Sequence, residues 1–220
     1  PLTIPVRAEV IGWRVPDPQE FQTIVQSEQS PYGVANAYKV KLWSDRHFEL
    51  IKSSFKQLAR TGNDWVFVPV LLNSEFGNRD DAPITWIRKK DGTLTFDYTI
   101  LDRYLAVAKK HLGIPRVICF DVMHGCGTQS TDVKIFNELT GKDEIIPVGQ
   151  SAAQTRRPLW RVFASSLYEH MKTLGLEKSM MWGHAFDETP DQGLIGILAE
   201  VVPEVGWAAG SHGRIPDETF

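Results

Sequence analysis

The sequence predicts an α/β fold of the (β/α)8 TIM-type barrel class, of which only about the first half is present. Apolar runs of strand length alternate with segments whose apolar residues recur at helical spacing. The resulting order, βαβαβαβαβ, is typical of parallel strands covered by helices. A doubly wound sheet also fits this order. The loops after the strands are long and those after the helices short, which favours the barrel, where the former build the site.

Five strands are predicted from the apolar runs, over residues 20–27, 64–72, 116–123, 179–186 and 205–210. Apolar side chains on both faces indicate strands that are covered on both sides. Pro69 counts against its strand, because proline removes a donor from the ladder. A barrel takes eight strands and about 250 residues, so we expect this one to be incomplete at its C-terminal side.

Four helices are predicted, over residues 44–62, 100–113, 159–175 and 189–202, from apolar spacing and from caps such as Ser44. Asp91-Gly92 predicts a small hairpin, whereas residues 28–43 and 140–149 are expected to be loops. Alternation over residues 6–16 predicts a strand. We therefore expect residues 1–17 to be the tail of a preceding β-domain or a linker, and residues 18–220 to form the barrel domain.

Composition excludes several classes of partner. The net charge is −3, with 24 basic and 27 acidic residues, and no basic stripe suggests nucleic acid. No apolar run approaches the about 20 residues of a membrane span. The chain has two cysteines and no CxxC, HExxH or Walker pattern, so neither a metal nor another cofactor is expected.

Two adjacent carboxylates are the strongest candidates for catalysis. Of three Asp-Glu pairs, 143–144 lies in a predicted turn and 217–218 near the C-terminus. Only Asp187 and Glu188 directly follow a predicted buried strand, where active-site residues collect in α/β folds. Apolar surroundings and a second acid would leave one carboxyl protonated, and such a pair can stabilise charge and donate a proton. Acids that only stabilise a helix N-terminus are the alternative.

An ordered set of segments carries a resemblance to a known family. The segments are "VPDPQEF", "QSPYGVANAY", "LWSDRHFEL", "WIRKKDGTLTFDYTILDRYL", "LWRVFASSLYEHMKTLG" and "FDETPD". Together they resemble the catalytic region of glycoside hydrolase family 123, from about Val6 to Arg214. The order of the segments is more diagnostic than any single motif.

This resemblance implies a retaining β-N-acetylgalactosaminidase whose barrel follows an N-terminal β-domain. Asp187 and Glu188 match the family's acid pair after the fourth barrel strand. The resemblance implies that the sugar's own acetamide oxygen is the nucleophile, one of the exceptions to the usual two-carboxylate scheme. Asp187 would orient the acetamide and Glu188 would be the general acid and base. It also implies a glycan, glycolipid or glycoprotein substrate and an extracellular or periplasmic location.

Sugar sites also need aromatic rings and polar groups. The candidate substrate-binding residues are Tyr32, Trp43, His124, Trp182 and His212. Tyr32 and Trp43 are expected on loops, and the alternative for His124 and His212 is that they are exposed loop residues. Trp86 is expected on a loop, where it could serve in the same way. Trp182 alternates with Gly183 along its strand, so its alternative is packing against helices.

Two rival functions stay open at this stage. An ordinary retaining glycosidase would need a second carboxylate about 5 Å across the site, and Asp121 is the first candidate. Its plainer interpretation is a hydrogen-bonded acid in the core. A carbohydrate-binding relative without turnover is the other rival.

Overall fold

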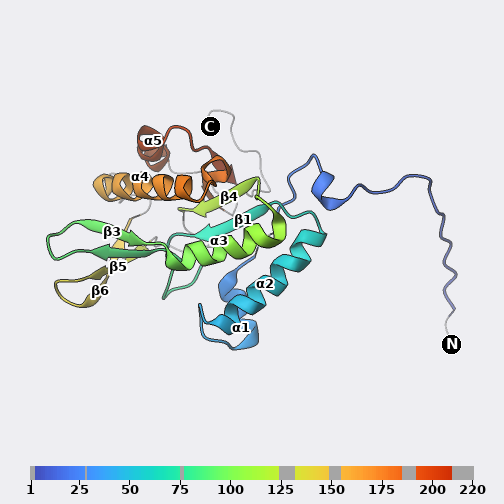
Figure 1. Ribbon diagram of the computed structural model, residues 1–220, viewed down its shortest axis with the longest axis horizontal. Coiled ribbons are helices and arrows are strands. Elements are labelled where there is room, and N and C mark those ends of the chain that lie inside the picture. The colour runs from blue at the N-terminus through green and yellow to red at the C-terminus, as the bar shows by residue number, and fades with distance from the viewer. Residues whose placement is uncertain are drawn as a thin grey trace.

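The computed structural model describes residues 3–27, 29–74, 77–123, 132–148, 155–184 and 192–209, with only the backbone of His184 and Ala209. Two four-stranded sheets and their covering helices make up this part of the chain (Figure 1). The strands are β1 (Trp65–Pro69), β2 (Thr85–Arg88), β3 (Leu94–Asp97), β4 (Val117–Asp121), β5 (Asp132–Asn137), β6 (Lys142–Pro147), β7 (Met180–His184) and β8 (Trp207–Ala209). The helices are α1 (Pro31–Tyr38), α2 (Asp45–Arg60), α3 (Thr99–Leu112), α4 (Arg157–Thr173) and α5 (Gln192–Val201), with short 3-10 turns at Pro18–Glu20 and Glu177–Ser179.

The first sheet is entirely parallel and has the strand order β1-β4-β7-β8. Consecutive β-strands of the predicted alternation therefore lie side by side, which confirms the α/β class. The strand expected over residues 20–27 is reduced to one parallel bridge, between Val25 and Asn63 beside β1. The predicted closed barrel is not confirmed, because the described strands form an open sheet.

Side chains alternate between the two faces of this sheet. Val66, Ile118 and Trp182 belong to the large core that the helices cover. Phe67 and Cys119 belong to a smaller buried cluster on the opposite face. Every residue of β1 and β4 is buried, as expected for parallel strands covered on both sides.

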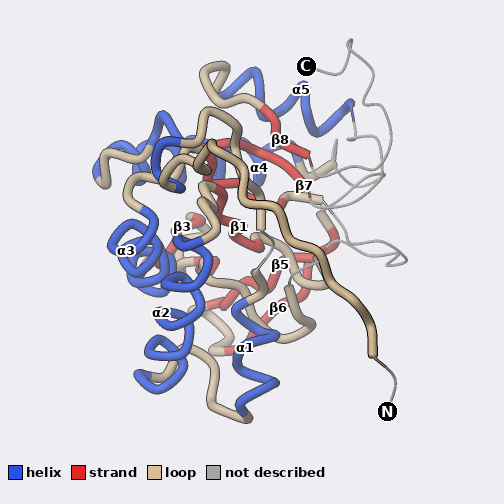
Figure 2. Tube along the Cα trace, turned by 90° about the vertical axis from the view of Figure 1, so that its right-hand side faces the viewer, coloured by secondary structure: helices blue, strands red, loops and turns tan. Residues whose placement is uncertain are grey.

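The four predicted helices are confirmed as α2, α3, α4 and α5. Ser44 begins α2 by accepting a hydrogen bond from the His47 amide at 3.3 Å, and the buried face of the helix carries Phe48, Ile51 and Phe55. Helix α2 packs against α3, and α4 packs against α5. In Figure 2, α2 and α3 lie along one side of the strands.

The second sheet is mixed and has the order β3-β2-β5-β6. Its β2–β3 hairpin confirms the turn predicted at Asp91-Gly92, where Gly92 has a φ of 86°. The loop predicted over residues 140–149 is wrong, because these residues supply β6 as the partner of β5. In Figure 1 this sheet lies beyond the carboxyl ends of β1 and β4, to which its hairpins are connected.

Two further expectations differ from the structure. The loop expected over residues 28–43 contains helix α1, which Ser30 caps by accepting from the Gly33 amide at 3.1 Å. The strand expected over residues 6–16 is not formed, since the described residues offer it no partner strand. Residues 3–16 instead run away from the body of the molecule, and the side chain of Val10 is 98% exposed (Figure 1). No helix among the described residues is long and apolar enough to cross a membrane.

Candidate active site

The carboxyl edge of the parallel sheet is the place where the predicted site residues should meet. Strand β7 lies between β4 and β8, and it ends at His184. Asp187 and Glu188, the predicted acids, follow three and four residues later and lie outside the described residues. The structure therefore shows the strand that precedes these acids in the sequence, and it shows that this strand ends at the carboxyl edge of the parallel sheet.

Close packing around Gly183 holds β7 in this position. Gly183 pairs in register with Asp121 on one side and with Ala208 on the other. A Cβ atom at residue 183 would lie 2.5 Å from Cys119 Sγ and would also collide with the Ala208 carbonyl oxygen. Only glycine allows β7 and β8 to approach this closely on the face opposite the helices.

Asp121 ends β4 on the same face of the sheet. Its side chain is 1% exposed, and Oδ1 accepts a hydrogen bond from the Met123 amide at 3.3 Å. Burial first, and the charge of Asp121 second, raise the pKa of the Cys119 thiol, which keeps that thiol protonated at neutral pH. A buried carboxyl group thus lies at the carboxyl edge, directly beside the strand that precedes the predicted acids.

Tyr32 lies inside the protein rather than on an open loop. It belongs to α1, is 2% exposed, and donates its hydroxyl hydrogen to the Asp81 carbonyl oxygen at 3.0 Å. Burial, followed by the charge of Asp81, raises the pKa of this phenol well above its ordinary value. Its ring meets that of Trp43 edge to face, with 5.6 Å between centroids. The expectation that Tyr32 lies on a loop is therefore wrong, and these contacts indicate packing.

Tyr32 and Trp182 are buried, whereas Trp43, the third predicted aromatic residue of the substrate site, is only partly buried. It lies just before α2, and its indole nitrogen donates to Asp81 Oδ2 at 2.7 Å. Asp81 belongs to the loop that follows β1, whereas Trp43 belongs to the segment between Val25 and α2. The two loops therefore meet beyond the carboxyl ends of neighbouring strands.

The indole of Trp182 faces the helices and is 0% exposed. Its neighbours include Phe120 of β4 and Phe163 of α4, each with ring centroids 6.3 Å away. This arrangement favours packing, the alternative that the sequence left open for Trp182. The expectation that Trp86 is on a loop is wrong, since it is buried in β2 and stacks on Phe163 at 4.5 Å.

His124 and His212, the two remaining predicted contacts, lie outside the described residues. Among the described residues, no group of three or more His, Cys, Asp or Glu side chains is placed to hold a metal ion.

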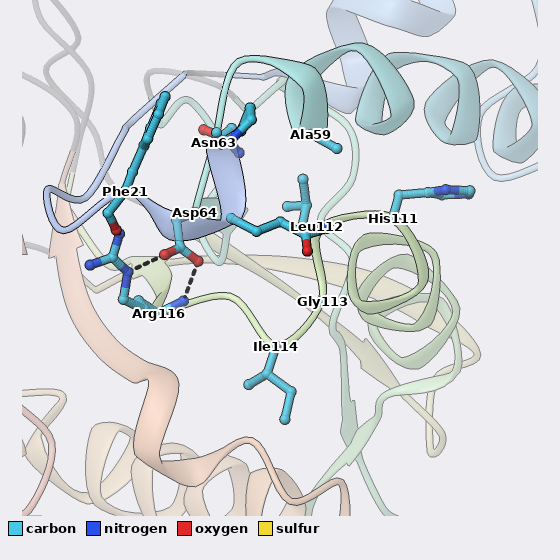
Figure 3. Close-up of a pocket in the computed structure, with 12 residues that line it drawn as sticks. Phe21, Ala59, Asn63, Asp64, His111, Leu112, Gly113, Ile114 and Arg116 are labelled. Atoms are coloured by element: carbon cyan, nitrogen blue, oxygen red, sulfur yellow. Dashed lines mark hydrogen bonds and ion pairs between the residues drawn. The ribbon is translucent and has the colours of Figure 1, made fainter. Parts of the chain in front are cut away.

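A hollow of about 450 Å³ lies at the opposite, amino edge of the sheet (Figure 3). Arg116, just before β4, and Asp64, just before β1, form an ion pair in its wall. The Arg116 guanidinium also donates to the carbonyl oxygens of Gln22 and Thr23 at 2.9 and 2.7 Å. These bonds hold the segment before Val25 against the sheet, and none of the predicted site residues that the structure describes lines the hollow.

Comparisons with known proteins agree with the resemblance in the sequence. No curated protein matches the chain. A solved structure of a family 123 glycoside hydrolase from Clostridium perfringens, described in terms of glycolipid glycan hydrolysis, is similar with a TM-score of 0.69 and 19% identity. The similarity covers 93% of this chain and 34% of the other, so this chain spans about a third of that protein. The model of the glycoside hydrolase 123 catalytic domain matches residues 29–206, and the chain therefore belongs to glycoside hydrolase family 123.

Proposed function

We propose that this chain carries the acids of a glycosidase that releases a β-linked N-acetylhexosamine, with N-acetylgalactosamine as the expected sugar, and retains the anomeric configuration. Family membership supports glycoside hydrolysis. The observation that carries the assignment to Asp187 and Glu188 is the position of β7, a strand with parallel neighbours on both sides whose carboxyl end leads directly to this pair. Active sites of parallel α/β folds form at that end of the strands.

In the proposed reaction the substrate supplies its own nucleophile. The acetamide oxygen attacks the anomeric carbon and forms an oxazolinium ring while the bond to the leaving oxygen breaks. Glu188 donates a proton to the leaving oxygen, and Asp187 accepts the acetamide N–H and stabilises the positive ring. Glu188 then takes a proton from the water that attacks the anomeric carbon, so that the original configuration is restored.

We also propose that the parallel sheet is the first half of a (β/α)8 barrel. The bridge at Val25 places the start of the chain beside β1, so the order from this bridge to β8 follows the sequence, as in a barrel. Residues 1–17 would then be the tail of a preceding β-domain or a linker.

Substitution of each acid tests the function. On aryl N-acetyl-β-galactosaminide and -glucosaminide, Asp187→Asn and Glu188→Gln should each lower kcat by about 10²–10⁴-fold. An activated leaving group should partly restore the first step in Glu188→Gln, because it needs less protonation. Asp143→Asn is the matched control, since it changes an exposed acid of the Asp-Glu pair in β6 and should leave kcat unchanged. Full activity in both acid variants would refute the assignment.

The position of Asp121 favours one second candidate, the ordinary retaining scheme with a protein nucleophile. Its buried carboxyl group lies at the same edge as the predicted acids. A fluorosugar that becomes covalently attached to a protein carboxylate would support this scheme. Inhibition by a thiazoline analogue of the oxazoline would support the substrate-assisted one, and a glycan that binds without being cleaved would identify a binding protein.

A further inference from the structure

Two hydrogen bonds hold helix α1 and the segment that joins it to α2 against the loop after β1. The Tyr32 hydroxyl donates to the Asp81 carbonyl oxygen at 3.0 Å, and the Trp43 indole nitrogen donates to Asp81 Oδ2 at 2.7 Å. Asp81 itself is fixed, because its Oδ1 accepts from the Ala82 amide at 2.8 Å. Helices α1 and α2 pack against each other and lie side by side (Figure 1). The position of Trp43 therefore decides whether the contact between this segment and the loop is closed.

The backbone of Trp43 has a conformation that is rare for a bulky residue. Its φ is 59°, in the left-handed region. Lys39 and Asn73 also have positive φ angles, but Lys39 is the C-cap of α1 and asparagine tolerates this region well. Trp43 has neither reason, so contacts with its surroundings must enforce this conformation.

A buried histidine supplies the enforcing contact. The Trp43 amide donates to His47 Nδ1 at 3.0 Å, and His47 Nε2 lies 2.8 Å from the Pro31 carbonyl oxygen. A backbone amide can only donate and a carbonyl oxygen can only accept, so Nδ1 carries no proton and Nε2 carries one. This is the pattern of a neutral imidazole. The side chain of His47 is 0% exposed, so water does not replace either bond.

An imidazolium ring does not fit this arrangement. A second proton, on Nδ1, would point at the Trp43 N–H group, and two donors cannot bond to each other. His47 also lies in the first turn of α2, where the positive end of the helix dipole disfavours a cation. Burial lowers the pKa of His47, against the opposing effect of the Pro31 hydrogen bond. Protonation therefore favours a state in which the ring reaches water.

The charged and titratable groups on the elements around His47 are bonded, neutral or exposed. In the loop after β1, the Asp81 carboxylate already accepts two hydrogen bonds. On α1, burial raises the pKa of Tyr32 well above its ordinary value, so this phenol is neutral. On α3, Arg103 pairs with Asp45 of α2 at 2.7 Å. The remaining groups on α1, the joining segment and the start of α2 are exposed, namely Tyr38, Lys39, Lys41, Arg46 and Glu49. The His47 ring is therefore the buried group whose protonation state this contact senses.

We propose that His47 is a pH-sensitive switch, which opens the contact between Trp43 and Asp81 when its ring takes up a proton. The Trp43 amide then loses its acceptor, the backbone leaves the left-handed region, and the indole leaves Asp81. Because Asp81 belongs to a loop at the carboxyl edge of the sheet, acid loosens that edge. The switch is independent of the proposed glycosidase function.

The size of the effect follows from proton binding. The closed state binds fewer protons than the open one, so closure is fully present above pH 6.5, the ordinary pKa of histidine, and is lost as the pH falls below it. If the closed state takes up no proton, the ratio of open to closed molecules rises about tenfold between pH 7.5 and pH 5.5.

Hydrogen exchange of the Trp43 amide in the whole protein is the first test. Its protection, corrected for the intrinsic exchange rate, should fall several-fold, and at most about tenfold, from pH 7.5 to pH 5.5. It should stay below the protection of the Ile118 amide in the central strand β4, because the opening is local. In His47→Gln, which keeps a donor and an acceptor without titrating, the protection should be equal at the two pH values. His170→Gln is the matched control, since it removes a histidine of α4 that pairs with Asp102 and should leave the wild-type pH dependence at Trp43.

Nitrogen NMR of the wild-type protein is the second test, and it needs no variant to fold. The ring signals of His47 should show the Nε2–H tautomer at pH 7.5, and the indole N–H signal of Trp43 should shift as the His47 ring titrates. An Nδ1–H tautomer at pH 7.5, or a wild-type protection that changes less than twofold, would overturn the proposal. So would an equal loss of protection in His47→Gln, or a Trp43 amide as protected as that of Ile118. If His47→Gln does not fold, the wild-type titration decides.

Discussion

Replacement of Gly183 by alanine should destabilise the protein strongly for a change of one methyl group. The new Cβ would be 2.5 Å from Cys119 Sγ and would overlap the Ala208 carbonyl oxygen on the neighbouring strand. Overpacking of a buried site costs about 1–3 kcal/mol. The upper part of this range applies, because a backbone oxygen can move away only if β8 moves with it. The urea unfolding midpoint should fall accordingly, with an unchanged m-value.

Gly196→Ala is the matched control. Gly196 lies within α5, and a Cβ there would meet no atom within 4 Å. Alanine should therefore stabilise this helix by up to about 1 kcal/mol. The two variants should thus move the unfolding midpoint in opposite directions. If Gly183→Ala were as stable as the wild type, the close approach of β7 to β8 would be wrong, and with it the placement of the strand that leads to the predicted acids.

Two other predictions concern buried titratable groups. Burial lowers the pKa of His47, so the folded protein binds fewer protons here than the unfolded chain, and the stabilisation present above pH 6.5 is lost as the pH falls below it. His47→Gln keeps one donor and one acceptor but does not titrate. Its urea unfolding midpoint should therefore fall less between pH 7.5 and pH 5.5 than that of the wild type. Burial also protects the Cys119 thiol, so in a Cys126→Ser background a thiol reagent should modify the protein only on unfolding, and labelling of the native protein would contradict this.

Helical periodicity was the most informative signal for the fold, because it reports one buried face over several turns. It identified α2 to α5, whereas α1 has only eight residues and a weaker pattern. The signal for α1 was the capping serine followed by proline, Ser30-Pro31. Strand β6 could not be recognised from its own residues, because four of the six are exposed and its stability depends on pairing with β5, which precedes it.

The candidate site was predictable to the extent that it depends on strand order. A run of apolar residues that ends in acidic residues indicates the carboxyl end of a buried strand, independently of the conformation of the following loop. The roles of Tyr32 and Trp43 were not predictable in this way, since both depend on Asp81, a residue of a different loop. No sequence pattern around Trp43 indicates its positive φ, which arises from the contact with His47.

The second sheet gives regular structure to the described parts of two long connections at the carboxyl edge. Two hairpins, one inserted after β1 and one after β4, pair through β2 and β5 and so become a single sheet. Trp86 of this sheet stacks on Phe163 of α4 at 4.5 Å, and Trp160 of α4 donates to the Val148 carbonyl oxygen at 3.0 Å just after β6. Loops of this length would otherwise lose much conformational entropy when a ligand binds. Because folding already orders the described strands of both hairpins, a ligand that bound at this edge would not need to order them.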